Sequence, residues 1–204
     1  RHPGDHYFPL MGAIIARSLG DPPIPWLQRA LERGPKVGRV HFLLGQVLGD
    51  YGHVDQALLE LRLAAEYEEG LAFYTSQAAL KLTRDPERLL SAAPEGRGGD
   101  AVLEALANAL SRPEDLDARE RIDLEAVARN PKVVTARDRL VDRRLAALET
   151  KSPPCEDAAA CAREIAEHAA SFETHAPATS RATVTRARLA LAEGRAADAA
   201  DMLR

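Results

Sequence analysis

Cys155 and Cys161 are the two cysteines of this sequence, and their spacing limits the chemistry that they can do. A structural zinc site would need histidines close to them in the sequence, and the pair lacks these. The six-residue spacing also differs from the C-x-x-C motif of redox enzymes. Two interpretations remain open. The cysteines form a disulfide between the loop before a helix and the second turn of that helix, or they are buried free thiols.

The segment EIAEH, residues 164 to 168, holds a second candidate pair. It resembles half of an inverted zinc-protease motif, but that motif requires histidine where Glu164 stands. Glu164 and His168 share a face of a helix, and this spacing favours a surface pair. The other histidines have no nucleophile or carboxylate partner at a catalytic spacing, and the sequence has no G-x-S-x-G nucleophile elbow. We therefore expect no catalytic centre, no cofactor and no bound transition metal.

Three glycines cluster in the segment APEGRGGDA. A phosphate-binding loop would follow a strand and precede a lysine, whereas here no strand pattern and no lysine are found, and Asp100 would repel phosphate. We interpret the segment as a helix breaker in which Asp100 caps the next helix. Residues 94–100 are therefore expected to be a glycine-rich connection between two parts of the chain.

Composition limits both the fold and the partners. Of the 204 residues, 46% are hydrophobic but only 4% are aromatic, and Ala and Leu, which favour helices, supply most of the apolar content. No segment alternates with period two, so we predict an all-α fold. The net charge of -4 gives no drive toward nucleic acid. The densest basic run is interrupted by aspartates, which favours a salt-bridged outer face. Its arginines are Arg137, Arg139, Arg143 and Arg144.

The ends of the sequence indicate a piece of a larger protein. It starts at Arg1 rather than at methionine, and it ends inside the helical pattern RAADAADMLR. No apolar run approaches the roughly 20 residues needed to cross a bilayer.

Small and large apolar residues recur with a period of roughly 34 residues. In the unit that begins at Gly38, small residues at Gly45 and Ala57 let two antiparallel helices approach closely. Gly52 lies between them and offers the positive φ that a tight reversal needs. This pattern resembles the tetratricopeptide repeat (TPR). The resemblance implies a right-handed solenoid of about six antiparallel helix pairs, in which each pair buries its apolar stripe against its neighbours.

The other units match this pattern less closely. In the first unit Ser18 stands where glycine is usual, and the second helix is expected to start late, near Pro25. The third unit is expected to have only a short second helix. TPR-like repeats are thus predicted over 4–93, and further hairpins, ending in a truncated TPR-like repeat, over 101–204. The predicted later pairs are 100–111 with 115–129, 132–149 with 157–173, and 179–192 with 196–204.

The TPR resemblance also implies a binding face, because the first helix of each pair lines the concave side of such arrays. The lysines and asparagines of the subtype that grips a C-terminal carboxylate are missing here, so that ligand is not expected. The phenylalanines of the three units either form an apolar groove for a peptide or pack into the core between repeats. The candidate groove residues are Phe8, Ile15, Arg39, Phe42, Gln46, Phe73 and Leu80.

Two functions follow from these expectations. The first is a non-catalytic scaffold within a larger bacterial protein. It would bind a protein or peptide partner, or associate with a second copy of itself. The second rests on the segments RHPGDHYFPLMGAIIA, WLQRALERGP and QALLELRLA, which are similar to the soluble TPR-bearing tail of bacterial O-antigen ligase-like membrane proteins. That similarity implies an accessory or substrate-positioning domain of a membrane-anchored glycan ligase. It also implies an extracytoplasmic, periplasmic location, which would favour the disulfide, with a cytoplasmic location as the alternative.

Overall fold

The computed structural model describes residues 5–204, and every regular element in that range is helical, as the sequence predicts. Gly4, the first residue of the expected repeats, lies outside the described residues. The chain divides into two compact units. Unit 1 extends to Ile122, and unit 2 comprises Asp123–Arg204. Among the described residues, no helix is long and apolar enough to cross a membrane.

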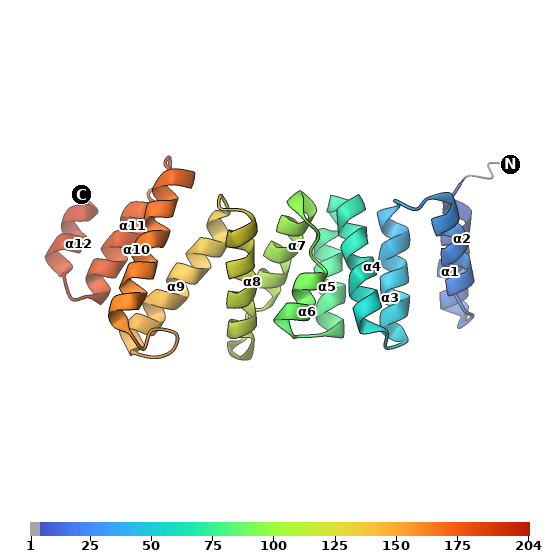
Figure 1. Cartoon of the computed structure of the whole chain (residues 1–204), viewed down its shortest axis with the longest axis horizontal. Coiled ribbons are helices and arrows are strands. Elements are labelled where there is room, and N and C mark those ends of the chain that lie inside the picture. The colour runs from blue at the N-terminus through green and yellow to red at the C-terminus, as the bar shows by residue number, and fades with distance from the viewer. Residues whose placement is uncertain (1–4) are drawn as a thin grey trace. The chain divides into compact units, whose positions relative to one another are not determined.

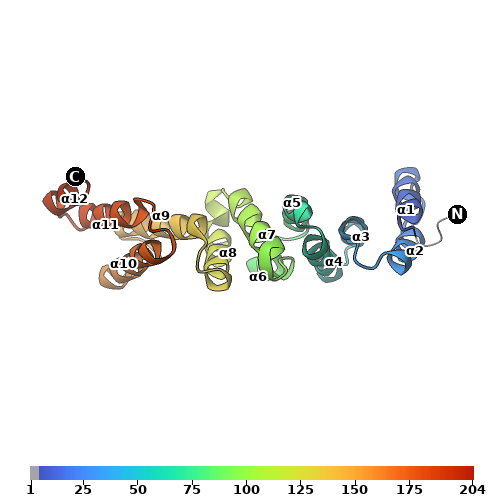
Figure 2. The ribbon, with the colours of Figure 1, turned by 90° about the horizontal axis from the view of Figure 1, so that it is seen from above.

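Within residues 5–122, unit 1 contains seven α-helices and the start of an eighth (Figure 1). In the view of Figure 2, α1 and α5 lie toward one side of this unit, and α2 and α6 lie toward the other. Helix α3 packs on α4 and α5, and α5 packs on α7. The helices are α1 (Tyr7–Leu19), α2 (Ile24–Arg33), α3 (Gly38–Asp50), α4 (Val54–Tyr67), α5 (Ala72–Leu82), α6 (Pro86–Ser91), α7 (Gly96–Ala109) and α8 (Leu116–Arg129), with single 3₁₀ turns at Glu69–Leu71 and Pro113–Asp115.

Unit 2 holds the end of α8 and four further helices. Helix α10 packs against both α9 and α11, and α11 packs against α9 and α12. Its core contains Ile165 and Phe172 of α10, both essentially inaccessible to solvent. The helices are α9 (Val134–Thr150), α10 (Ala158–His175), α11 (Arg181–Ala192) and α12 (Ala196–Met202).

One glycine turn occurs three times. Gly20, Gly52 and Gly194 have φ of 80°, 81° and 80°, and each precedes the second helix of a hairpin. In all three turns the residue after the glycine donates its N–H to the carbonyl five residues back, at 2.8 to 2.9 Å. Positive φ favours glycine because it has no Cβ, so the structure confirms the role predicted for Gly52. In the first hairpin the glycine comes two residues after Ser18, because α1 continues to Leu19.

Small residues bring α3 and α4 together, as predicted. A Cβ added at Gly45 would lie 3.0 Å from both the Ala57 carbonyl oxygen and Leu61 Cγ. Ala57 and Leu61 are completely buried. The late start of α2 and the short α6 are also confirmed. Asp85 fixes the start of α6, because its carboxylate accepts hydrogen bonds from the first backbone N–H groups of the helix, while Pro86 occupies the first helical position.

The expected connection over 94–100 is mostly the first turn of α7 instead. The helix begins at Gly96, so Asp100 lies inside it and is not its cap. A Cβ at Gly98 would clash with the carbonyl oxygen of Ala65 in α4, and one at Gly99 would overlap that of Pro94. These glycines therefore allow backbone segments to approach closely. In the sequence alone, glycines with this role look the same as glycines that break a helix.

Candidate interaction groove

Helices α1, α3 and α5 line an apolar cavity of about 540 Å³ in unit 1 that is open to solvent. Phe42 of α3 is half-buried beside it, and its ring meets that of Tyr74 edge to face, 6.4 Å between centroids. Tyr7 and Tyr74 are 54% and 56% exposed at its edges. The cavity is lined by His6, Tyr7, Leu10, Met11, Ile14, Val37, Arg39, Phe42, Leu43, Gln46, Leu71 and Tyr74.

A smaller hollow of about 210 Å³ continues from this cavity along α3 and α5, and Phe42, Gln46 and Tyr74 line both. Arg17 of α1 reaches across to α3, where it donates to Gln46 Oε1 at 2.8 Å and to Asp50 Oδ2 at 2.7 Å. These bonds tie the first hairpin to the second beside the cavity. We call the two adjoining hollows the α1/α3/α5 groove.

The structure brings some of the predicted groove residues together and separates others. Arg39, Phe42 and Gln46 line the main cavity, and Phe73 lines a separate hollow between α5 and α7. Phe8 and Ile15 are exposed on α1, 65% and 54%, and contribute to neither hollow of the groove among the described residues. The same is true of Leu80, which is half-buried.

The residues that sequence reasoning missed lie next to the predicted ones. Tyr7 and Ile14 line the cavity where Phe8 and Ile15 were expected, and Tyr74 does so beside Phe73. Consecutive side chains of an α-helix point about 100° apart around the helix axis. An error of one residue in the predicted register therefore selects the adjacent face. Helix α1 carries apolar side chains around most of its circumference, and its sequence therefore gave no signal that distinguished the two faces.

Arg39 and Lys81 supply positive charge near the groove. Arg39 Nε lies 3.3 Å from Glu68 Oε1 and remains largely exposed. Lys81 is exposed and lines the smaller hollow near Asp50, which already pairs with Arg17. The groove is therefore apolar along its floor, and its edges carry Lys81 together with the ion pairs Arg39–Glu68 and Arg17–Asp50.

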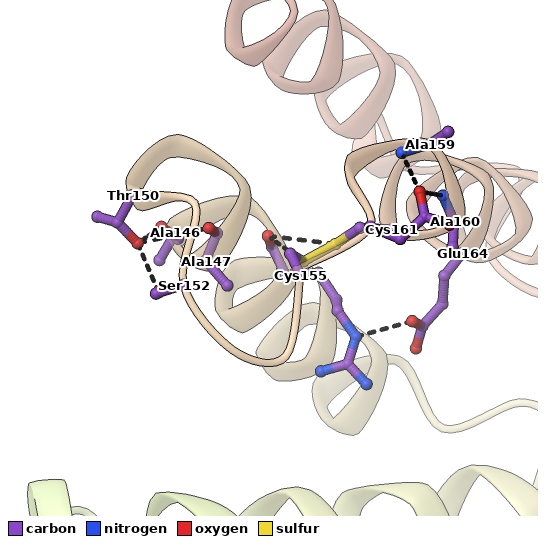
Figure 3. Close-up of a disulfide and its surroundings, with 11 residues drawn as sticks. Ala146, Ala147, Thr150, Ser152, Cys155, Ala159, Ala160, Cys161 and Glu164 are labelled. Carbon is purple, nitrogen blue, oxygen red and sulfur yellow. Dashed lines mark hydrogen bonds and ion pairs between the residues drawn. A yellow bond between two sulfur atoms is a disulfide. The ribbon is translucent and has the colours of Figure 1, made fainter.

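The cysteines are joined by a disulfide in the structure. Cys155 and Cys161 are 2% and 4% exposed, and their Cα atoms are 5.4 Å apart (Figure 3). Both sulfur atoms lie near the carbonyl oxygen of Arg144 in α9, at 3.2 and 3.7 Å. The bond links the loop after α9 to the second turn of α10, and Asp157 caps that helix by accepting from Ala159 N and Ala160 N.

Arg139 and Arg144 of the basic run of α9 are salt-bridged, to Asp123 and Glu164, but the run does not form an outer face. Arg137 and Arg144 are only 9% and 7% exposed, because α10 and α11 both pack against α9. Arg144 Nε donates to Glu164 Oε2 of α10 at 2.8 Å. Glu164 and His168 are therefore not a surface pair, since Glu164 binds Arg144 and His168 is buried.

Two buried histidines have opposite surroundings. In unit 1, His41 Nδ1 lies 2.6 Å from Glu60 Oε2 and Nε2 lies 2.9 Å from the Pro35 carbonyl oxygen. Burial alone would lower the pKa of His41, but the bonds to Glu60 and Pro35 outweigh it and raise that pKa. In unit 2, burial first and then the charge of Arg137 lower the pKa of His168. The sequence did not reveal the carboxylate beside His41, because Glu60 lies on the next helix.

The described residues 5–204 include no group of three or more His, Cys, Asp or Glu side chains that could hold a metal ion. No protein-family model matches the chain, and no curated protein matches it. The groove and the two buried histidines are therefore interpreted from their own chemistry.

Proposed function

We propose that unit 1 is a TPR-like, non-catalytic scaffold whose α1/α3/α5 groove binds one amphipathic α-helix of a partner protein. The observation that carries this proposal is the open apolar cavity of about 540 Å³ around Phe42, edged by exposed aromatic rings. Exposed apolar patches of this kind commonly mark interaction sites.

Repetition within the helices supports a TPR-like array. The turns at Gly20 and Gly52 share one φ and one hydrogen-bond pattern, and a third turn at Gly194 repeats both. Packing of α3 on α5 and of α5 on α7 places first helices beside one another, as stacked repeats would. Such stacking leaves a shared surface along the first helices, which is the surface that holds the groove.

The chemistry of the groove favours a helix with acidic flanks as its occupant. An amphipathic helix presents apolar side chains three and four residues apart, which suits a continuous apolar floor such as the one around Leu10, Phe42 and Leu43. Lys81 would attract a carboxylate on one side of that stripe, and the exposed Arg39 would attract one on the other side in exchange for its contact with Glu68. Aromatic rings at the edges bury a large area at a small cost in conformational entropy.

The test uses a displayed library of helical peptides of about 16 residues, from which peptides that bind the purified chain are selected. Aromatic anchors typically contribute about 2 kcal/mol, so Tyr74→Ala should weaken the selected peptides by roughly thirtyfold. Tyr51→Ala is the matched control, because Tyr51 is 53% exposed but lies in the α3–α4 turn, outside both hollows of the groove. Its affinity should stay within about twofold of the parent.

Phe42→Ala then distinguishes groove from core. A groove residue loses peptide affinity while the thermal melt stays near that of the parent, whereas a core phenylalanine costs roughly 3–5 kcal/mol of stability. Selection of extended peptides, or equal binding by the Tyr74 and Tyr51 variants, would refute the helix-binding groove.

The disulfide supports a second candidate, an exported accessory domain such as the tail of a membrane glycan ligase-like protein. Disulfides persist in oxidising compartments, and Cys155 and Cys161 are joined. Thiol counting under denaturing, non-reducing conditions tests this candidate with protein isolated from its own cells. Two free thiols would remove the support.

A further inference from the structure

His168 of unit 2 is packed against a permanent cation. The ring lies between α10 and α9, it is 9% exposed, and its Nδ1 is 3.5 Å from Nη1 of Arg137. A guanidinium group has donors only and stays charged in proteins, so Nδ1 has to act as the acceptor. The ring is therefore neutral, with its proton on Nε2, and within residues 5–204 that atom has no hydrogen-bond partner.

Protonation of His168 would disrupt this contact. The added proton would sit on Nδ1, where it removes the acceptor of Arg137 and places two buried cations against each other. The charged groups nearby do not offset this. Arg144 adds a further positive charge from α9, while Glu164 on the preceding turn is already bound to Arg144. Glu167 is exposed on the same helix. The arginines of α11 form ion pairs with other residues, namely Arg181 with Asp138, Arg186 with Glu173 and Arg188 with Asp142.

The surroundings of His41 in unit 1 favour the protonated, positively charged imidazole instead. Glu60 of α4 and the carbonyl of Pro35 are both acceptors, so each ring nitrogen has a partner when the imidazole is protonated. The ring of Tyr67 lies beside it at 5.3 Å between centroids, and the nearby cation Arg39 on the same helix is paired with Glu68. Acid therefore strengthens the α3–α4 hairpin instead of weakening it.

We propose that the chain carries two opposed acid responses, in which mild acidification loosens the α9–α10 packing of unit 2 and leaves the α3–α4 hairpin of unit 1 tight. Unit 2 would then be an acid-responsive part and unit 1 an acid-resistant one. This proposal does not depend on what the groove binds.

The signs follow from linkage between protonation and folding. A lowered pKa of His168 means that its contribution to stability is complete above the ordinary histidine pKa of about 6.5 and is lost as the pH falls below it. The raised pKa of His41 means that its contribution is complete below about 6.5 and is lost as the pH rises through the raised value. Between pH 7.5 and 5.5 the two effects run in opposite directions.

Hydrogen exchange of the whole chain, read by mass spectrometry and corrected for intrinsic rates, tests both responses at once. Protection in α9 and α10 should fall by up to roughly tenfold from pH 7.5 to 5.5. This is the ratio of protonated to neutral imidazole for an ordinary histidine, with a pKa of about 6.5, at pH 5.5. Protection in α3 and α4 should stay equal or rise. Unchanged protection of α9 and α10 would overturn the proposal.

His168→Gln keeps an acceptor for Arg137 but cannot titrate, so its α9–α10 protection should no longer depend on pH. His175→Gln is the control, because His175 is exposed at the end of the same helix and its variant should keep the parent response. If protection of α9 and α10 still depends on pH in His168→Gln, the acid response belongs to another group and the proposal is wrong. If His168→Gln does not fold, NMR titration of the unmodified chain decides: an apparent pKa of His168 at or above 6.5 would refute the mechanism.

Discussion

Gly98→Ala separates two explanations of the glycine-rich segment, because they predict opposite signs. If these glycines only interrupt the chain, alanine would stabilise the first turn of α7 by about 1 kcal/mol, its advantage in helix propensity. In the structure the new Cβ would clash with the carbonyl oxygen of Ala65 in α4. That atom belongs to the backbone and cannot rotate away, so the helices have to separate, at a cost of roughly 1–3 kcal/mol. After the gain in helix propensity is subtracted, we expect a net loss of up to about 2 kcal/mol.

The assay is urea unfolding of the parent and two variants, followed by circular dichroism. Gly70→Ala is the matched control, since a Cβ there would meet nothing within 4 Å and its backbone does not have positive φ. It should unfold within about 0.5 kcal/mol of the parent. A midpoint for Gly98→Ala at or above that of the parent would refute the close contact between α7 and α4.

Three further predictions concern single features of the helices. Gly52→Val should cost about 1 kcal/mol or more in a thermal melt through strain at φ 81°, since a Cβ there has open space around it; an unchanged melt would mean that the turn relaxes freely. Asp157→Ala should cost about 1 kcal/mol in urea unfolding, because it removes the acceptor for Ala159 N and Ala160 N; Asp157→Asn, which keeps an acceptor, should lose less. Reduction of the disulfide should destabilise unit 2 by about 2 kcal/mol, given a sequence separation of 6; equal melts with and without reductant would contradict the chain-entropy argument.

The helices and their turns could be predicted because the information is local. Gly52 acts through its own lack of a side chain, and Asp85 with Pro86 marks a helix start within two residues. The short α6 follows from the same kind of local pattern. Where one residue and its immediate neighbours determine the conformation, the sequence pattern and the structure agree.

Contacts between distant segments could not be predicted. Gly98 resembles a breaker until the carbonyl of Ala65 is placed beside it, 33 residues earlier in the chain. Arg144 belongs to a run of charges typical of a solvated face, yet Glu164 and two packed helices bury it. The groove depends on the rotation of α1, which its nearly uniform apolar surface leaves unspecified in the sequence. The first two misses come from a contact partner that lies elsewhere in the chain.

The distribution of aromatic residues links the composition to the proposed groove. Small residues and leucine fill the core, and of the four Phe, one Trp and four Tyr only Phe172 is among the largest fully buried side chains. Phe172 is also the only aromatic residue of unit 2, where it lies in the core. A core that packs with Ala and Leu has no need of large rings, so the exposed Tyr7 and Tyr74 of unit 1 are not explained by folding. We therefore assign the proposed partner binding to unit 1 and the proposed response to acid to the buried His168 of unit 2.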